Sequence, residues 1–371
     1  MVDSYKGSSS LSSAPRTTVR RTNRFGARTA VRTFAISRTP IVLELNHSQI
    51  LRVGYAEQSK PHHTLMLEDG FSCHDDTSKP FSLNQNLTET QWYNVLSPII
   101  TRVYDRLMCN PTTRRVVCVL PHLASTNMIK ALKQMLWNKG VPAVTVWSNL
   151  EILPVAQGWK RGLIVHVSKE ETVCVCHSDG HVLPYTYQSV PVGYGQLVAQ
   201  EEQEGEEETK ENNKLQLEWT PHMDDLFLNE NNPNSAVTAV LKTMEDCPRD
   251  VRHNCVSNIV FAGEGVLLFP DLSRRVIQRV KTILEGNPAP LNLVTTSTAS
   301  TTEQQENVKI MTLTPVDTKS LAALAPKLQL ISTHPHRPDW ISWMGASLWA
   351  AAWNKYDDEE SSIKWTFGPA D

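Results

Sequence analysis

The sequence predicts an α/β fold built from one unit used twice, a β-hairpin followed by alternating helices and strands. Two apolar hairpins, at residues 40–57 and 162–176, carry this prediction, because amphipathic helices and short apolar strands follow each of them. The third observation is the stretch 258–280, an apolar run, a turn at Gly263-Glu264-Gly265 and an amphipathic segment. Such a turn lets a backbone approach a phosphate closely. Taken alone, it is better explained as a tight turn between a buried strand and its packing helix.

The first half begins with the hairpin 40–57, whose strands are separated by a turn at Asn46-His47-Ser48. Residues 58–90 are polar and without clear periodicity, so we expect a reduced loop region. A helix is predicted at 90–108, where Pro98 should kink the helix or end a first piece of it. Its apolar face is predicted to consist of Trp92, Val95, Leu96, Ile99, Ile100, Val103, Tyr104 and Leu107. The remaining elements of this half are predicted as a strand at 114–120, a helix at 125–138, a strand at 141–147 and a short helix at 148–157.

The second half repeats this order with more interruptions. Its hairpin has strands at 162–167 and 172–176, joined by a turn at 168–171, and a third strand is expected at 180–187. The later elements are predicted as a helix at 235–245, a strand at 259–262, the glycine turn with its helix, a strand at 308–313 and a helix at 340–353.

Charge is distributed unevenly along the chain. Residues 1–39 carry eight Lys/Arg and one acid, whereas the rest carries 28 basic and 38 acidic residues. The basic segment is poor in acids and large aliphatic residues and is interpreted as a disordered tail, although its composition also matches a mitochondrial transit peptide. Its few aromatic residues do not form a regular base-stacking pattern with the basic residues, so we do not expect nucleic acid as a partner. Residues 201–211 hold seven acids and one base and are expected to be solvated. No run of 18 apolar residues is present, which predicts no membrane span.

Seven cysteines are present, an odd number without a CxxC pair. This usage indicates reduced thiols rather than a disulfide framework. Cys174-Val175-Cys176-His177 invites interpretation as a zinc site, but its residues alternate within a strand-like run and no second ligand pair has metal spacing. We therefore predict no metal site.

Five short motifs, in the right order, resemble motifs of actins and actin-related proteins. They match the end of the first hairpin, the strand of the second hairpin, the return strand with the glycine beyond it, the nucleotide turn, and a tryptophan motif near the C-terminus. The motifs are Arg52-Val53-Gly54-Tyr55-Ala56, Gly162-Leu163-Ile164-Val165, Val182-Leu183-Pro184 with Gly193, Ala262-Gly263-Glu264-Gly265, and Trp343-Met344-Gly345-Ala346-Ser347.

This resemblance implies an actin-like (ribonuclease-H-like) fold, with duplicated hairpin α/β domains around a central cleft and reduced outer subdomains. The implied organisation is a basic tail at 1–39, a first half at 40–157, a second half at 158–335 with an acidic insertion at 200–214, and a C-terminal helix region at 336–371 that returns to the first half.

Two longer stretches are similar to the pointed-end actin-related subunits of dynactin. They are residues 107–117, LMCNPTTRRVV, and residues 246–252, DCPRDVR. The resemblance implies a cytoplasmic, cytoskeletal subunit that caps the pointed end of an actin-like filament and supports dynein-driven transport on microtubules. Its implied partners are an actin-like filament subunit and the other pointed-end proteins of dynactin, with dynein reached indirectly. Residues 58–90 and about 200–234 correspond to the end of actin that accepts the next subunit of the filament. The first region is short and the second is largely replaced by an acidic run, which implies a filament cap rather than a homo-polymer.

The same resemblance implies a degenerate nucleotide cleft. The two aspartates that hold the metal's water shell in actins fall on Leu45 and His166, and the water-orienting glutamine falls near Asn149. The residues left in the phosphate positions are Ser48, Lys169, Gly263 and Gly265, of which Lys169 could replace a phosphate ligand. We therefore expect no catalytic residue, no bound metal, no hydrolysis and no required cofactor, while ATP or ADP binding stays open.

Two other functions are compatible with the sequence. An actin-fold ATPase would need phosphate loops that the chain lacks. A nuclear actin-related subunit of a chromatin-remodelling complex could use the basic tail on DNA, with a steep dependence of binding on salt. Partner contacts are expected in the helix region 340–353, although its tryptophans are equally typical of a core.

Overall fold

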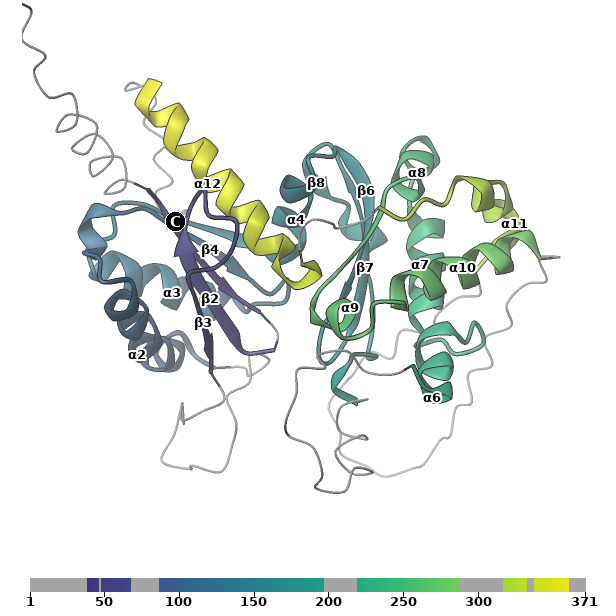
Figure 1. The fold of residues 1–371 in the computed structure, drawn as a ribbon, viewed down its shortest axis with the longest axis horizontal. Coiled ribbons are helices and arrows are strands. Elements are labelled where there is room, and N and C mark those ends of the chain that lie inside the picture. Colours follow the sequence, from purple (N-terminus) through teal and green to yellow (C-terminus); the bar gives the residue numbers. More distant parts are fainter. Residues whose placement is uncertain are drawn as a thin grey trace, which may run out of the picture. The chain divides into compact units, whose positions relative to one another are not determined.

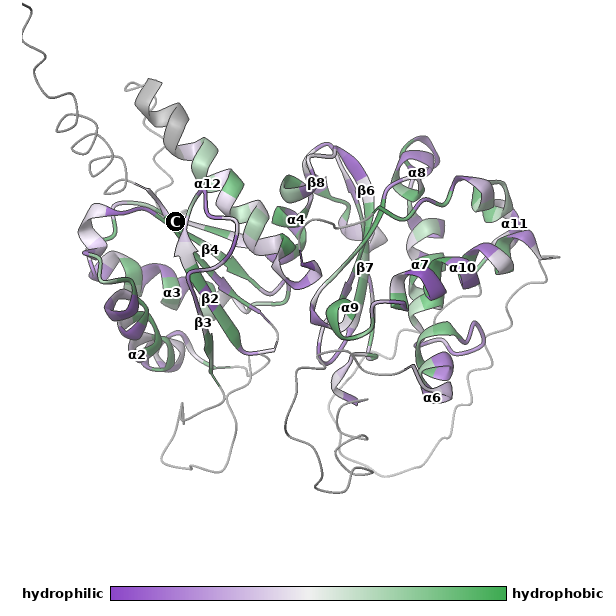
Figure 2. Ribbon diagram, viewed as in Figure 1, coloured by the Kyte–Doolittle hydropathy of each residue, from purple (hydrophilic) through white to green (hydrophobic). Residues whose placement is uncertain are grey.

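The computed structural model describes residues 39–46, 48–67, 87–196, 219–286, 316–331 and 337–359, with side chains up to residue 353. It has a mixed α/β architecture with two mixed sheets and helices packed on them (Figure 1). The central strands of both sheets are buried and are coloured mainly as hydrophobic (Figure 2). The predicted basic tail, the acidic insertion and the strand expected at 308–313 lie outside the described residues.

The first sheet has five strands in the order β3-β2-β1-β4-β5. The hairpin strands β1 and β2 are antiparallel, and β1, β4 and β5 run parallel. The predicted hairpin and both later strands are confirmed. The expectation of a loop throughout 58–90 is wrong, because residues 63–66 form an edge strand antiparallel to β2. The bounds are β1 Ile41–Leu45, β2 Ile50–Tyr55, β3 His63–Met66, β4 Val116–Leu120 and β5 Val144–Ser148.

Helices α2 (Glu89–Leu107) and α3 (Thr126–Asn138) cover one face of this sheet and form its main core. The N-terminus of α2 is fixed by Thr88 and Gln91, which form a capping box. All eight residues of the predicted apolar face of α2 are buried. The helix continues through Pro98 as a single element, so the expectation that it might end there is wrong. A short 3₁₀ turn, Pro111–Thr113, leads into β4.

The second sheet has the order β10-β6-β7-β8, and β9 also pairs with β7. As in the first sheet, the hairpin strands β6 and β7 are antiparallel, and a later strand, β10, runs parallel to the first hairpin strand. The single strand expected at 180–187 is wrong, because only His181–Val182 is a strand there. A 3₁₀ turn at Pro184–Thr186 follows it, and the next strand begins at Gln188. The bounds are β6 Arg161–Val167, β7 Thr172–Ser178, β8 His181–Val182, β9 Gln188–Val190 and β10 Ile259–Ala262.

The helices of the second sheet include the predicted α7 (Ala236–Asp246), which Cys247 ends as C-cap residue before Pro248. A strand, the glycine residues and a helix follow one another around Gly263 as predicted. Glu264 and Gly265 are, however, the first residues of a short helix that precedes α10, and Gly263 is its N-cap residue. The other bounds are α6 Pro221–Met223, a π-helical turn Asp224–Leu228, α8 Arg249–Val256, α9 Glu264–Leu268, α10 Leu272–Glu285, α11 Thr318–Leu321 and a 3₁₀ turn Ala322–Lys327.

The predicted C-terminal helix is α12 (Ile341–Glu359), which follows a 3₁₀ turn at Pro338–Trp340. It packs on β1, β4 and α4 (Asn149–Gln157), with Trp343 fully buried. Gly345 is required here, because a Cβ atom would lie 2.2 Å from the carbonyl oxygen of Ile152. Among the described residues, no helix is both long enough and apolar enough to cross a bilayer.

Candidate functional site

A buried ion pair lies within the first hairpin. The antiparallel register places Glu44 on β1 directly opposite Arg52 on β2. Their side chains meet, with Nη1 of Arg52 3.1 Å from Oε2 of Glu44, and both residues are 2–3 % exposed. Leu45 points to the other face of the strand and packs with α2 and α3. The hairpin thus aims a carboxylate and a guanidinium away from the main core of the first sheet.

Arg52 also contacts two acids that are distant in sequence. Its Nη2 lies 3.4 Å from Oε1 of Glu264, the residue between the two glycines after β10. The same nitrogen lies 3.0 Å from Oδ2 of Asp339, and Nη1 donates to the Asp339 carbonyl oxygen at 2.8 Å. One guanidinium therefore joins the first hairpin, the glycine turn of the second sheet and the segment before α12.

We call Arg52 and its three acidic partners, Glu44, Glu264 and Asp339, the Arg52 cluster. Polar neighbours form further hydrogen bonds to it. Ser342 donates a hydrogen bond to Glu44, and Asn46 donates one to Glu264. Ser48 donates to Oε2 of Glu264 at 3.5 Å, and its hydroxyl lies 2.8 Å from that of Tyr194. Asp339 also pairs with Arg337, whose Nε lies 3.0 Å from Oδ1. These hydrogen bonds satisfy carboxylate oxygens that burial has removed from water.

The electrostatics of the cluster are governed by burial. Burial raises the pKa of Glu44 and of Glu264, and the neighbouring Arg52 offsets part of that rise. For Arg52 itself, burial favours the neutral form, but Glu44, Glu264 and Asp339 together raise the pKa, so the guanidinium stays charged. Three acids face two guanidinium groups, Arg52 and Arg337, and the arrangement leaves negative charge in excess when all three are ionised.

The space left among these side chains is small. Glu44, Arg52, Glu264 and Asp339 all line a cavity of about 10 Å³, together with Asn149 and His166. That volume holds about one water molecule. A polyphosphate would also meet carboxylates there, and both Arg52 terminal nitrogens already donate to protein oxygens. Among the described residues, the arrangement is suited to holding chain segments together and leaves little room for a phosphate.

Gly263 and Gly265, both predicted as phosphate-turn residues, have a packing role. Gly263 has a φ of 97°, and a Cβ atom on it would lie 2.3 Å from the carbonyl oxygen of Val167. A Cβ atom on Gly265 would lie 2.4 Å from Cγ1 of Val167. The amide of Gly263, which a phosphate would need, donates to the Pro338 carbonyl oxygen at 3.1 Å. Close approach of the turn to the end of β6 explains both glycines.

The other predicted site residues do not gather at one place. Ser48 donates to Glu264 of the Arg52 cluster, whereas Lys169 is exposed in the β6–β7 turn and does not line the cavity. His166 and Asn149, at the expected metal and water-orienting positions, contact each other, with Nε2 and Nδ2 3.4 Å apart. These two side chains offer no carboxylate to a hard cation such as Mg²⁺.

Arg52 and Asp339 were not among the site residues predicted from the sequence. A signal for Arg52 was available, because two opposite charges stand on otherwise apolar hairpin strands and the hairpin register pairs them. No comparable signal exists for Asp339, whose place depends on tertiary packing. Outside this cluster, the described residues contain one group of potential metal ligands, formed by Cys176, Cys247 and Cys255.

The chain was also compared with known proteins. A scan against protein-family models and a search of curated protein sequences both found no match.

Proposed function

We propose that this protein is a non-catalytic actin-related subunit that caps the pointed end of the actin-like filament of dynactin, as the family of actin-related protein 10 does. The sequence motifs at the end of the first hairpin, in the first strand of the second hairpin, at the glycine turn and near the C-terminus support this assignment. In this role the protein works in the cytoplasm on the cytoskeleton and contributes to dynein-driven transport through its partners.

The sheet connections support an actin-like fold. In both sheets a hairpin is followed by a helix and then by a strand parallel to the first hairpin strand. Helix α12 then returns to the first sheet, as the resemblance implies for the C-terminal region. Use of the same connection order twice is the expected topology of the duplicated hairpin unit.

The Arg52 cluster carries the non-catalytic part of the proposal. It occupies the space between the first hairpin, the glycine turn and the segment before α12, where an actin-like protein holds the phosphates. An active enzyme of this fold needs amides and metal-binding carboxylates that point into open space. Here the carboxylates point at Arg52, and the Gly263 amide is bonded within the protein. This makes an actin-fold ATPase the weaker alternative.

The capping part rests on the dynactin-like stretches at 107–117 and 246–252 and on the reduced outer segments. A subunit that keeps one polymer-facing end and lacks the other can join a filament but cannot accept a further copy. The expected partners are therefore an actin-like filament subunit and the other pointed-end proteins of dynactin.

The test is affinity purification of the tagged full chain from the cells that produce it, followed by mass spectrometry. We expect an actin-like filament subunit and other pointed-end dynactin proteins in stoichiometric amounts. A second chain that begins at Thr39 serves as the matched control. It should capture the same proteins, because the proposed contacts do not involve the basic tail. Recovery of chromatin-remodelling subunits, lost on removal of the tail, would instead establish the nuclear alternative.

A further inference from the structure

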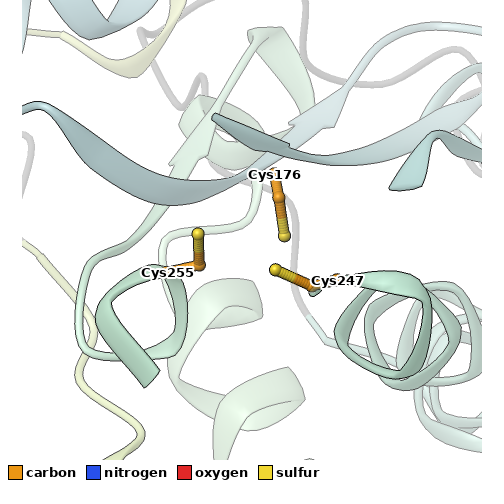
Figure 3. Close-up of side chains that lie close together, drawn as sticks. All are labelled: Cys176, Cys247 and Cys255. Atoms are coloured by element: carbon orange, nitrogen blue, oxygen red, sulfur yellow. The ribbon is translucent and has the colours of Figure 1, made fainter. Parts of the chain in front are cut away.

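Three cysteine side chains from separate elements point toward one another behind the second sheet (Figure 3). Cys176 lies on β7, Cys247 is the C-cap residue of α7, and Cys255 lies in α8. Their sulfur atoms are all within 4.8 Å of one another, and each residue is at most 1 % exposed. All three are free thiols.

The usual explanation of a buried cysteine is that it fills the core as a small apolar residue. Cys174 fits that explanation. It lies two residues before Cys176 on the same face of β7, in the same core, but is not part of the three-sulfur group. The convergence of three sulfurs is a different observation, because a strand, a helix end and a second helix each contribute one ligand atom to the same point.

The geometry suits a thiolate-bound metal ion. Three sulfurs about 2.3 Å from one ion are themselves about 4 Å apart, so inward movements of a few tenths of an ångström would suffice. Thiolate ligands select soft ions such as Zn²⁺ and Cu⁺, and they disfavour Mg²⁺ and Ca²⁺. An ion would also compensate the charge of thiolates that burial otherwise makes costly.

The site can also exist without an ion. The Cys176 thiol lies 4.0 Å from the carbonyl oxygen of Thr243, and the Cys255 thiol lies 3.7 Å from that of His177, so both protons have acceptors.

We propose that Cys176, Cys247 and Cys255 form a buried site for one thiophilic metal ion, Zn²⁺ or Cu⁺. The bound ion ties β7 to the end of α7 and to α8, and so stabilises the layer of helices on the second sheet. Cu⁺ is satisfied by three thiolates. Zn²⁺ prefers four ligands and would need a further one, for which the carbonyl oxygens of Thr243 and His177, 4.0 and 3.7 Å from the sulfurs, are candidates.

The experiment uses the full chain, purified reduced and without oxygen. Separate samples are incubated with Zn²⁺ alone or with Cu⁺ held by a weak chelator, desalted, and analysed for metal content and thermal stability. We expect one ion per chain with at least one of the two metals. The midpoint of thermal unfolding should rise by about 5 °C or more. The ion retained at the lower free concentration identifies the preferred metal.

The variants are Cys247→Ala and Cys247→Ser, with Cys174→Ala as matched control for loss of a buried thiol. The control should keep the bound ion and the thermal shift, and both Cys247 variants should lose them. Equal metal retention by the control and the Cys247 variants would overturn the proposal.

A measurement on the unaltered chain covers the case in which the Cys247 variants fail to fold. Cobalt(II) added to the unaltered chain should give the near-ultraviolet sulfur-to-cobalt charge-transfer absorption of thiolate ligands. Binding without that absorption, or no binding of any of these ions, would also overturn the proposal and leave three reduced core thiols.

Discussion

The guanidinium of Arg52 donates to Asp339 twice, to the backbone carbonyl oxygen at 2.8 Å and to Oδ2 at 3.0 Å. The two residues lie at opposite ends of the described chain, one in the first hairpin and one just before α12. The contact therefore ties the first hairpin to the segment before α12.

Replacement of Arg52 by alanine should destabilise the protein strongly. The change leaves Glu44, Glu264 and Asp339 buried without their shared cation, and loss of one partner of a buried ion pair costs about 3–5 kcal/mol. Denaturant unfolding at neutral pH measures this loss. The matched control is Arg274→Ala, which removes a well exposed ion pair with Asp271 and should cost at most about 1 kcal/mol. Similar losses for the two variants would contradict the assigned role of Arg52.

The stability of the protein should depend on pH through Glu264. Its folded-state pKa is raised above the ordinary value of 4.5, mainly by burial. A carboxyl group with a raised folded-state pKa contributes to the free energy of unfolding in full below pH 4.5. This contribution is lost as pH rises through the folded-state pKa. The Glu264→Gln variant lacks this titration, so its stability relative to the wild type should increase as pH rises from 4.5. Urea unfolding across that range measures the difference.

Glu230 offers a control of opposite sign for the pH series. Burial alone would raise its pKa, but the hydrogen bond from Arg279, a backbone hydrogen bond and the positive charge of Arg279 together outweigh burial and lower it. The ionised Glu230 carboxylate stabilises the folded protein in full above its ordinary pKa. This stabilisation is lost as pH falls through the lowered folded-state pKa. Glu230→Gln should therefore lose stability relative to the wild type as pH rises. A common slope for the two variants would refute the assigned environments.

Gly263→Ala should lower the stability of the protein more than alanine does at another glycine with a positive φ. Gly158 also has a positive φ, of 66°, but a Cβ atom there would meet nothing within 4 Å. Its replacement should cost about 1–2 kcal/mol through backbone strain alone. At Gly263 the clash with Val167 adds to that strain, and the total should exceed the Gly158 value by at least about 1 kcal/mol. Equal losses in thermal unfolding would remove the packing explanation of the glycine turn.

Elements with a strong local pattern could be predicted from the sequence. The eight-residue face of α2 was predicted in full, because apolar residues at helical spacing leave one solution for the buried side. The strand β3 was missed, because His63–Met66 is a short edge strand whose residues alternate between half-buried and exposed. At Pro184, which the sequence displays plainly, a 3₁₀ turn replaces the middle of an expected strand.

The candidate site could be predicted only in part. Ser48 and the glycine turn were identified from motifs, and the structure places Ser48 and Glu264 in contact. Arg52 and Asp339 meet only through tertiary packing, which neither local spacing nor composition encodes. The cysteine group shows the same difficulty. Cys176 lies far from Cys247 and Cys255 in sequence, and the latter two have no metal-motif spacing, so only the fold brings the three sulfurs together.

The most direct test of the central claim is a calorimetric titration of the purified full chain with Mg-ATP, paired with a turnover assay and with conventional actin as positive control. The filled Arg52 cluster predicts no saturable binding up to about 1 mM nucleotide and no phosphate release above background. Saturable, Mg²⁺-dependent binding, or ATP turnover that Lys169→Ala abolishes, would contradict the account.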